Sequence, residues 1–168
     1  MMIKGLVKVS GEASKATAII TRPNDTTAYA INDVVGSAHA TNLEFLNIAT
    51  IIGSTIIITG VSLEMDATSL PTGTSGYRLH IYNEAPTAIA DNVSYNLIAA
   101  DRSKYLGNII LDAPIDLGDT LWSDTRNINM QCKLTDTSNT LYGVLETLGA
   151  YTPVASTIKR LKLNVLGV

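Results

Sequence analysis

Short stretches in which apolar and polar residues alternate, separated by turn residues, constrain the fold of this chain more than any other feature. The alternation is strictest in residues 56–66, 77–83, 127–134 and 158–165, and a period of two is that of a half-buried β-strand. About ten such stretches follow one another at spacings of roughly 8 to 15 residues, without an amphipathic crossover helix between them. This pattern predicts an all-β fold, a single-domain antiparallel β-sandwich that is jelly-roll-like.

The partners of the strands can be predicted only in part. Because residues 67–76 are rich in Thr, Ser, Pro and Gly, the segments 56–66 and 77–83 are expected to pair as a central hairpin. Asp124 and Thr125 are expected to turn the chain between a short strand and the strand at 127–134. The other strands are expected at residues 3–9, 15–21, 26–31, 43–51, 105–111, 121–122 and 141–147.

The faces of several strands follow from parity. In 56–66, Ile57 is expected to share a face with Val61, Leu63 and Met65, and in 77–83 the face that carries His80 is expected to be polar and wet. The segment 43–51 changes parity midway, which indicates a β-bulge or a strand buried on both faces. The segment 141–147 is apolar on both parities, so we expect it at the centre of a sheet.

Residues 87–104 form a long excursion between two strands. The segment lacks a full helical stripe and contains weak helix formers, so one or two short helical turns are expected within this crossover. Ile89, Val93 and Leu97 are spaced to form a buried plug that closes one end of the sandwich. On the exposed side, the candidate contact residues for another subunit are Asp101, Arg102 and Lys104.

Length and composition exclude several classes of partner. The 168 residues fit one domain at 13–168, preceded by an N-terminal strand or arm at 1–12. A net charge of −3 does not supply the basic face that phosphate binding needs, so no nucleic-acid partner is predicted. No stretch reaches the ~18 apolar residues of a membrane span, and no membrane partner is predicted. Charged residues make up only 16%, which suits a surface of Thr, Ser and Asn or one covered by partners.

The sequence offers little for catalysis, and no enzyme activity, cofactor or metal is predicted. Only two histidines are present, His39 and His80, and neither lies near a Gly-x-Ser-x-Gly elbow. The carboxylates of Asp112, Asp116 and Asp119 do not have the spacing of a regular calcium loop. The single cysteine, Cys132, shares its strand face with apolar residues, which favours a buried thiol over a nucleophile.

Two features remain as candidate interfaces. Trp122 is either a half-buried ring at one end of the sandwich or an anchor at a protein interface, where Trp is enriched. The cationic cluster of Lys159, Arg160 and Lys162 is either a solvated strand face or a salt-sensitive contact to an acidic neighbour.

Several stretches resemble a family of tailed-bacteriophage virion structural proteins. The likeness covers most of residues 16–165 and is carried by residues 20–35, which begin Ile-Thr-Arg-Pro-Asn-Asp, and by residues 77–90, 100–107, 140–146 and 151–155. The resemblance implies a capsid decoration, or cement, protein on the capsid surface of the virion, made in the cytoplasm of the bacterial host. It further implies the major capsid protein as partner and a homotrimer, because trimers suit positions where three shell subunits meet.

Two other functions stay open at the level of the sequence. A phage tail or receptor-binding module would use the same β-sandwich to bind host glycans through its loops. A small hydrolase would have to use His39 or His80, and it is the weakest of the three hypotheses.

Overall fold

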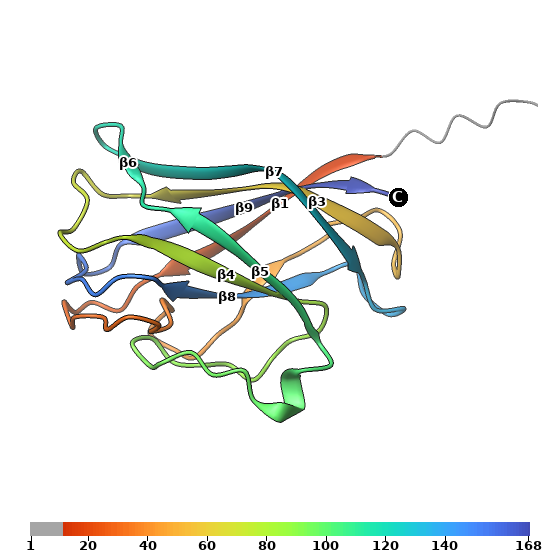
Figure 1. Ribbon diagram of the computed structural model, residues 1–168, viewed down its shortest axis with the longest axis horizontal. Helices are drawn as coiled ribbons and strands as arrows, with labels where there is room; N and C mark the ends of the chain where they lie inside the picture. The colour runs from red at the N-terminus through yellow and green to blue at the C-terminus, as the bar shows by residue number, and fades with distance from the viewer. Residues whose placement is uncertain (1–11) are drawn as a thin grey trace, which may run out of the picture.

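The computed structural model describes residues 12–168, which form a flattened β-sandwich (Figure 1). The N-terminal strand predicted at 3–9 lies outside the described residues. The elements are β1 (Ala13–Thr21), β2 (Leu43–Phe45), β3 (Thr55–Met65), β4 (Gly76–Tyr82), the 3-10 turn η1 (Ala99–Asp101), β5 (Tyr105–Asp112), β6 (Ile115–Asp116), β7 (Leu121–Lys133), β8 (Leu141–Thr147) and β9 (Ile158–Gly167).

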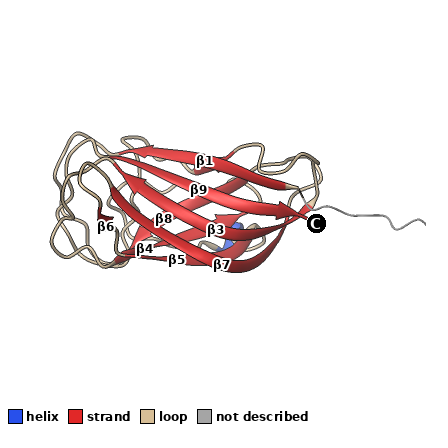
Figure 2. Ribbon diagram, turned by 90° about the horizontal axis from the view of Figure 1, so that it is seen from above, coloured by secondary structure: helices blue, strands red, loops and turns tan. Residues whose placement is uncertain are grey.

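The strands form two antiparallel sheets that pack face to face (Figures 1 and 2). One sheet has the order β1-β9-β3-β7-β6 and the other β2-β8-β4-β5. Without the two-residue β6, each sheet has four strands. Consecutive strands lie in different sheets except β4 and β5, which pair with each other, and this is the two-Greek-key pattern of a jelly roll. The predicted jelly-roll-like antiparallel sandwich is therefore confirmed.

The core lies between the inner faces of the two sheets. Alternate residues of β1, β3 and β9 face inward, and side chains such as Ile56, Leu63, Leu161 and Leu163 are completely buried. They meet Phe45, Leu79, Ile81, Leu111, Leu141 and Leu145 from the second sheet. Each fully buried Leu or Ile contributes about 1.5–3 kcal/mol, so this layer is the main stabilising feature of the fold.

A β-bulge in the β3–β7 pair changes two predictions. The register shifts between Ile58 and Gly60, so Ile56 and Ile58 are buried together with Val61, whereas Ile57 faces outward. On the partner strand, Asn127 takes a positive φ of 59° at the same place. The expected turn at Asp124-Thr125 is therefore wrong: the chain kinks at the bulge and continues as one 13-residue strand, β7.

The predicted central hairpin is also wrong. β3 pairs with β7 and β9, whereas β4 pairs with β5 and β8 in the other sheet. The loop between β3 and β4 thus carries the chain from one sheet to the other. Alternation shows that a strand has a buried face, but it does not show which strand lies beside it.

Two further predicted strands differ from the structure. Residues 26–31 contribute only an isolated bridge between Tyr29 and Tyr151. β2 ends at Phe45 because Asn47 takes a positive φ of 52° and the chain turns. The central position of 141–147 is confirmed, since β8 lies between β2 and β4.

The crossover, residues 83–104, lies over the outer face of the β2-β8-β4-β5 sheet, as the green segment below β8 and β4 in Figure 1 shows. It pairs with the 30–36 segment at an isolated Asp33–Ser94 bridge, and Val34 in turn bridges to Glu146 of β8. Ile89 and Leu97 pack against Tyr82 and Val144. One short helical turn, η1, is present as predicted. Val93, however, is 49% exposed, and the plug covers a sheet face and not an end of the sandwich.

Candidate functional site

The outer face of the β1-β9-β3-β7-β6 sheet, the sheet seen from above in Figure 2, brings together three of the seven predicted interface residues: Trp122, Arg160 and Lys162. Pairing across the five strands places one row of side chains on this face: Ile19, Arg160, Glu64, Trp122 and Ile115. Lys162 stands beside this row, one pleat along β9. We call these six residues the open sheet face. Its two ends are apolar and exposed, with Ile19 at 61% and Ile115 at 60%.

The charges of the open sheet face are paired with one another. The Arg160 guanidinium contacts Asp66 Oδ1 at 2.5 Å and Glu64 Oε1 at 3.2 Å, and Lys162 Nζ donates to Glu64 Oε2 at 2.6 Å. The hydrogen bond from Lys162 holds the pKa of Glu64 below its ordinary value. These pairs are partly exposed, so each contributes little to stability but fixes the position of its side chains.

Trp122 is half-buried and borders a shallow groove of about 480 Å³. Lys162 Nζ lies 5.5 Å from the centroid of its ring, within range of a cation–π interaction. The groove runs along the middle of the sheet, and its polar lining includes Lys15, Thr59, Asp124, Arg126, Asn127 and Asn164. An aromatic ring beside fixed polar groups can bind either a protein surface or a polar ligand.

Lys159 does not belong to this surface, and its predicted place on a solvated strand face is wrong. It alternates with Arg160 and points into the core, where it is 1% exposed. No carboxylate of residues 12–168 lies within 4.0 Å of its ammonium group. Burial, with a smaller effect of the Arg22 charge, lowers its pKa to about 7.

The three predicted contact residues of the crossover have different surroundings. Asp101 is 4% exposed, so its expected place on the exposed side is wrong. Its carboxylate accepts hydrogen bonds from Lys104 Nζ at 2.8 Å and from the Thr87 N–H at 2.9 Å. The bond from Lys104 is the main reason that the pKa of Asp101 is lowered. These bonds connect two parts of the crossover. Of the three predicted contact residues, only Arg102 is exposed.

His80 lies under the crossover, and the prediction that its strand face is wet is wrong. The imidazole is 4% exposed, stacks on Tyr95 at 3.7 Å and contacts Glu146 Oε2 at 2.6 Å. Arg78 donates to both oxygens of the same carboxylate at 3.1 Å. Burial lowers the pKa of His80. Its polar contacts are Glu146 and the Tyr105 hydroxyl, which is the pattern of a packed, hydrogen-bonded histidine.

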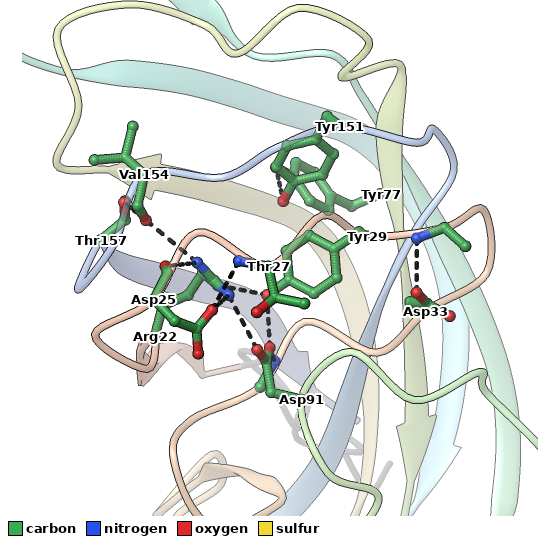
Figure 3. Close-up of polar contacts among 12 residues, drawn as sticks. Arg22, Asp25, Thr27, Tyr29, Asp33, Tyr77, Asp91, Tyr151, Val154 and Thr157 are labelled. Carbon is green, nitrogen blue, oxygen red and sulfur yellow. Dashed lines mark hydrogen bonds and ion pairs between the residues drawn. The ribbon is translucent and has the colours of Figure 1, made fainter.

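A buried polar cluster at one end of the sandwich escaped the sequence analysis (Figure 3). Arg22, whose side chain is fully buried, donates to the Tyr29 hydroxyl at 2.6 Å and pairs with Asp91 at 3.1 Å. The Tyr29 hydroxyl donates to Asp91 Oδ1 at 2.6 Å, and the Gly36 N–H donates to the same oxygen at 2.8 Å. Burial and the Asp91 charge raise the pKa of Tyr29. The cluster ties the crossover to β1.

Nothing in the sequence signalled this cluster beyond the turn at 22–25. Its partners are 62 and 69 positions apart along the chain, and no local pattern links such residues. Every polar member has a partner within the cluster, so we assign it a structural role.

The remaining candidates give no site. Within residues 12–168 no group of three or more His, Cys, Asp or Glu side chains is placed to hold a metal ion. The Cys132 thiol is buried, and burial raises its pKa to about 11, as expected for an inert core cysteine. The described part of the chain has no helix of the length and hydrophobicity needed to cross a membrane.

Comparison with known proteins adds little. No protein-family model and no curated protein sequence matches the chain. Among solved structures, a protein of Desmodium yellow mottle tymovirus aligns with 10% identity and a TM-score of 0.34, over 99% of this chain and 93% of the other. A protein of sacbrood virus of honeybee aligns with 10% identity and a TM-score of 0.30, over 98% of this chain and 75% of the other.

A third structure is a xylanase of Clostridium thermocellum that contains a CBM22 and a GH10 module. It aligns with 11% identity and a TM-score of 0.33, over 92% of this chain and 26% of the other, so the chain spans about a quarter of that enzyme's length. TM-scores this low carry no weight for function, which has to rest on the chain itself.

Proposed function

We propose that this protein is a capsid decoration, or cement, protein of a tailed bacteriophage. It binds the major capsid protein in the assembled head and stabilises the shell by mass action, because it binds the assembled lattice and not the free subunit. On this proposal the protein resides on the capsid surface of the virion, is made in the host cytoplasm and is not an enzyme.

The open sheet face is the observation that carries the proposal. It is broad and uncovered, and its charges are already paired, so a partner need not desolvate isolated ions. Trp122 lies between Glu64 and Ile115 near one end of the sheet, and Trp is the residue type most enriched among the anchor residues of protein interfaces. The resemblance of residues 16–165 to virion structural proteins supports the same conclusion.

The contact is proposed to be modest in each subunit and multiplied by assembly. A homotrimer would present three open sheet faces, and each contact after the first would form at the effective concentration set by the first. Arg102, an exposed cationic residue of the crossover, is the proposed contact outside the open sheet face. Asp101 and Lys104 form an ion pair next to Arg102 in the chain. Lys159 is buried and cannot contact a partner directly.

Co-sedimentation with purified heads tests the proposal. The full chain should pellet with expanded heads that lack it and should remain in solution with the free capsid subunit. Trp122→Ala should weaken binding by at least about thirtyfold, which corresponds to the lower limit of about 2 kcal/mol for a hot-spot residue. A matched control is Ile31→Ala, which removes a 58% exposed aliphatic side chain from a loop outside the open sheet face.

Light scattering on the free protein gives a second, independent readout. A strict monomer that is not retained on expanded heads would contradict both parts of the proposal. Retention of the Trp122→Ala variant at wild-type strength would leave the function standing but would remove the open sheet face as its site.

One observation favours a second candidate function. The groove beside Trp122 has the size of a small-ligand site and a polar lining, so a tail module that binds neutral glycans is the alternative. Because Trp122 is the only tryptophan, its fluorescence reports directly on this groove. Quenching by a glycan at micromolar concentration, together with a position at the tail in labelled micrographs, would replace the first proposal with the second.

A further inference from the structure

β1 is an edge strand whose free side is predictable from its ladder. It pairs with β9 over Ala13–Thr21 without a register shift. The same ladder continues beyond both ends of the strand: Gly167 N donates to Glu12 O at 2.9 Å, and Arg22 N donates to Thr157 O at 3.1 Å. Both bonds belong to even-numbered residues on the β1 side. Because hydrogen-bonded and non-bonded pairs alternate, the odd-numbered residues direct their N–H and C=O groups away from β9.

The outward groups of this edge have no partner among residues 12–168. They belong to Ala13, Lys15, Thr17, Ile19 and Thr21. None of these residues makes a backbone hydrogen bond to any other described element, and all five side chains are exposed. The strand therefore presents a nine-residue row of alternating donors and acceptors, which is the pattern that an added β-strand satisfies.

The other long edges of the sandwich are protected. On β5, the outward carbonyls of Ile110 and Asp112 accept hydrogen bonds from hydroxyl groups of β7, each at 2.9 Å. β7 itself carries a bulge and is partly capped by β6, and β2 has only three residues. β1 has no proline and no bulge, and Lys15 is its only charged residue. Natural sheets use prolines, bulges and edge charges to prevent pairing, so an edge with a single lysine among these devices is open to an added strand.

We propose that the β1 edge pairs with β1 of a second copy, antiparallel about a two-fold axis at Thr17. This register places Thr17 against the partner's Thr17 and Lys15 against the partner's Ile19. Thr–Thr pairs are favourable in sheets, and the aliphatic stem of Lys15 covers the exposed Ile19 side chain. No like charges lie opposite each other. The inward residues next to the junction, Ala16 and Ala18, are small, so the two sheets continue into each other.

The contact goes beyond the proposed function and does not depend on it. It is two-fold and isologous, whereas the proposed trimer is three-fold, so the two contacts use different symmetry axes. Alone, the β1 contact gives a dimer; together with the trimer it gives a hexamer of three-fold and two-fold symmetry. Failure to bind heads would therefore leave this inference intact.

Sedimentation of the full chain over a hundredfold range of concentration, with two variants of one residue, is the test. Thr17→Pro removes an outward N–H that β9 does not use, and an edge strand accommodates proline there. We expect the wild-type mass to double with concentration and Thr17→Pro to raise the dissociation constant by at least about tenfold. Thr17→Val keeps the N–H and should associate like the wild type.

Cross-linking tests the register and does not require the proline variant to fold. Thr17→Cys should form a symmetric disulfide under mild oxidation, because directly opposite Cα atoms lie about 5.5 Å apart. Thr21→Cys should not, since its counterpart is the partner's Ala13. Cys132 is buried and gives no background.

Two results would overturn the inference. One is a mass that does not depend on concentration and is the same for all three proteins. The other is slow hydrogen exchange of the Lys15 and Thr17 amides in dilute solution, where the proposed β1 contact is dissociated, because it would mean that another segment already covers the edge.

Discussion

The outer faces of the two sheets differ sharply. The β2-β8-β4-β5 sheet is covered by the crossover and buries His80, Tyr82 and Glu146 on its outer side. The outer side of the β1-β9-β3-β7-β6 sheet has no such cover, and Arg160 and Lys162 form partly exposed ion pairs there with Glu64. The polar residues on the covered face thus stabilise the fold by hydrogen bonds and ion pairs within the protein, whereas those on the open sheet face are available to a partner.

The same residue types therefore have different roles on the two faces. Arg78 and Arg160 both contact carboxylates on an outer sheet face, but Glu146 beneath Arg78 is 2% exposed, and Asp66 beside Arg160 is 44% exposed. Removing a partner from the covered face leaves a buried charge, while removing one from the open face leaves a solvated charge. Mutations on the covered face should therefore mainly lower stability, and mutations on the open sheet face should mainly weaken binding.

The largest loss of stability is expected where the crossover is bound to the end of β1. Asp91→Ala leaves the fully buried Arg22 guanidinium without its main counter-charge, which should lower the free energy of unfolding by about 3–5 kcal/mol. Denaturant titration at pH 7 measures this. Asp25→Ala is the matched control, because Asp25 contacts the same guanidinium at 3.3 Å but is 45% exposed, and its loss should cost much less. Equal costs would contradict the distinction.

The second largest loss of stability is expected where the crossover packs against the outer face of its sheet. Tyr95→Ala removes the ring that stacks on His80 and the hydroxyl that contacts Tyr82 at 2.6 Å, with an expected cost of about 3 kcal/mol. The amides of β8 should also exchange faster. Trp122→Ala, on the open face, should cost about 1 kcal/mol or less, because its ring is only half-buried. A larger cost for Trp122→Ala than for Tyr95→Ala would reverse the comparison.

A third prediction concerns the lysine that the core encloses. The pKa of Lys159 is about 7 when folded and 10.5 by its ordinary value. Between these values the unfolded chain holds a proton that the folded chain lacks, so stability should rise with pH from 7 to 10.5 and should not depend on this group below 7.

Lys159→Met should therefore stabilise the protein by about 2 kcal/mol at pH 7, and it should lose the pH dependence that is due to this group. Thermal melts at several pH values measure both. Lys162→Met, on the same strand but on the open face, should not change the pH dependence between 7 and 10.5. A destabilised Lys159→Met protein would show that the amine has a favourable partner in the core.

The smallest effect is expected for Glu64→Gln. Its two cationic partners, Arg160 and Lys162, remain hydrated, so the cost should stay below about 1 kcal/mol and should shrink further in high salt. Head binding, in contrast, should weaken, because Arg160 and Lys162 lose the carboxylate that positions them. Loss of stability without loss of binding would assign these pairs to the fold.

Much of the sandwich follows from the sequence, because a strand with one buried face shows a period of two. β1, β4, β8 and β9 lie within one or two residues of their predicted positions. The pairing of β3 could not be predicted, because alternation carries no information about the neighbour. The bulge at Asn127 could not be predicted either, because apolar and polar residues continue to alternate across it.

The candidate site was only partly predictable for a similar reason. The cationic cluster joins three residues by charge, but only Arg160 and Lys162 share a parity along the strand, whereas Lys159 has the opposite parity and points into the core. The link from Trp122 to this pair runs through Glu64 of a third strand, and only the sheet order reveals it. The buried state of His80 depends on a crossover whose position no local pattern gives.

Hydroxyl-radical footprinting of the protein on expanded heads shows which outer sheet face meets the shell. We expect oxidation of Trp122 to fall at least about fivefold on binding, while Tyr95 and Leu97 of the crossover are oxidised as in free solution. Protection of the crossover with Trp122 unchanged would contradict it, because the covered face and not the open one would then be the surface that meets the shell.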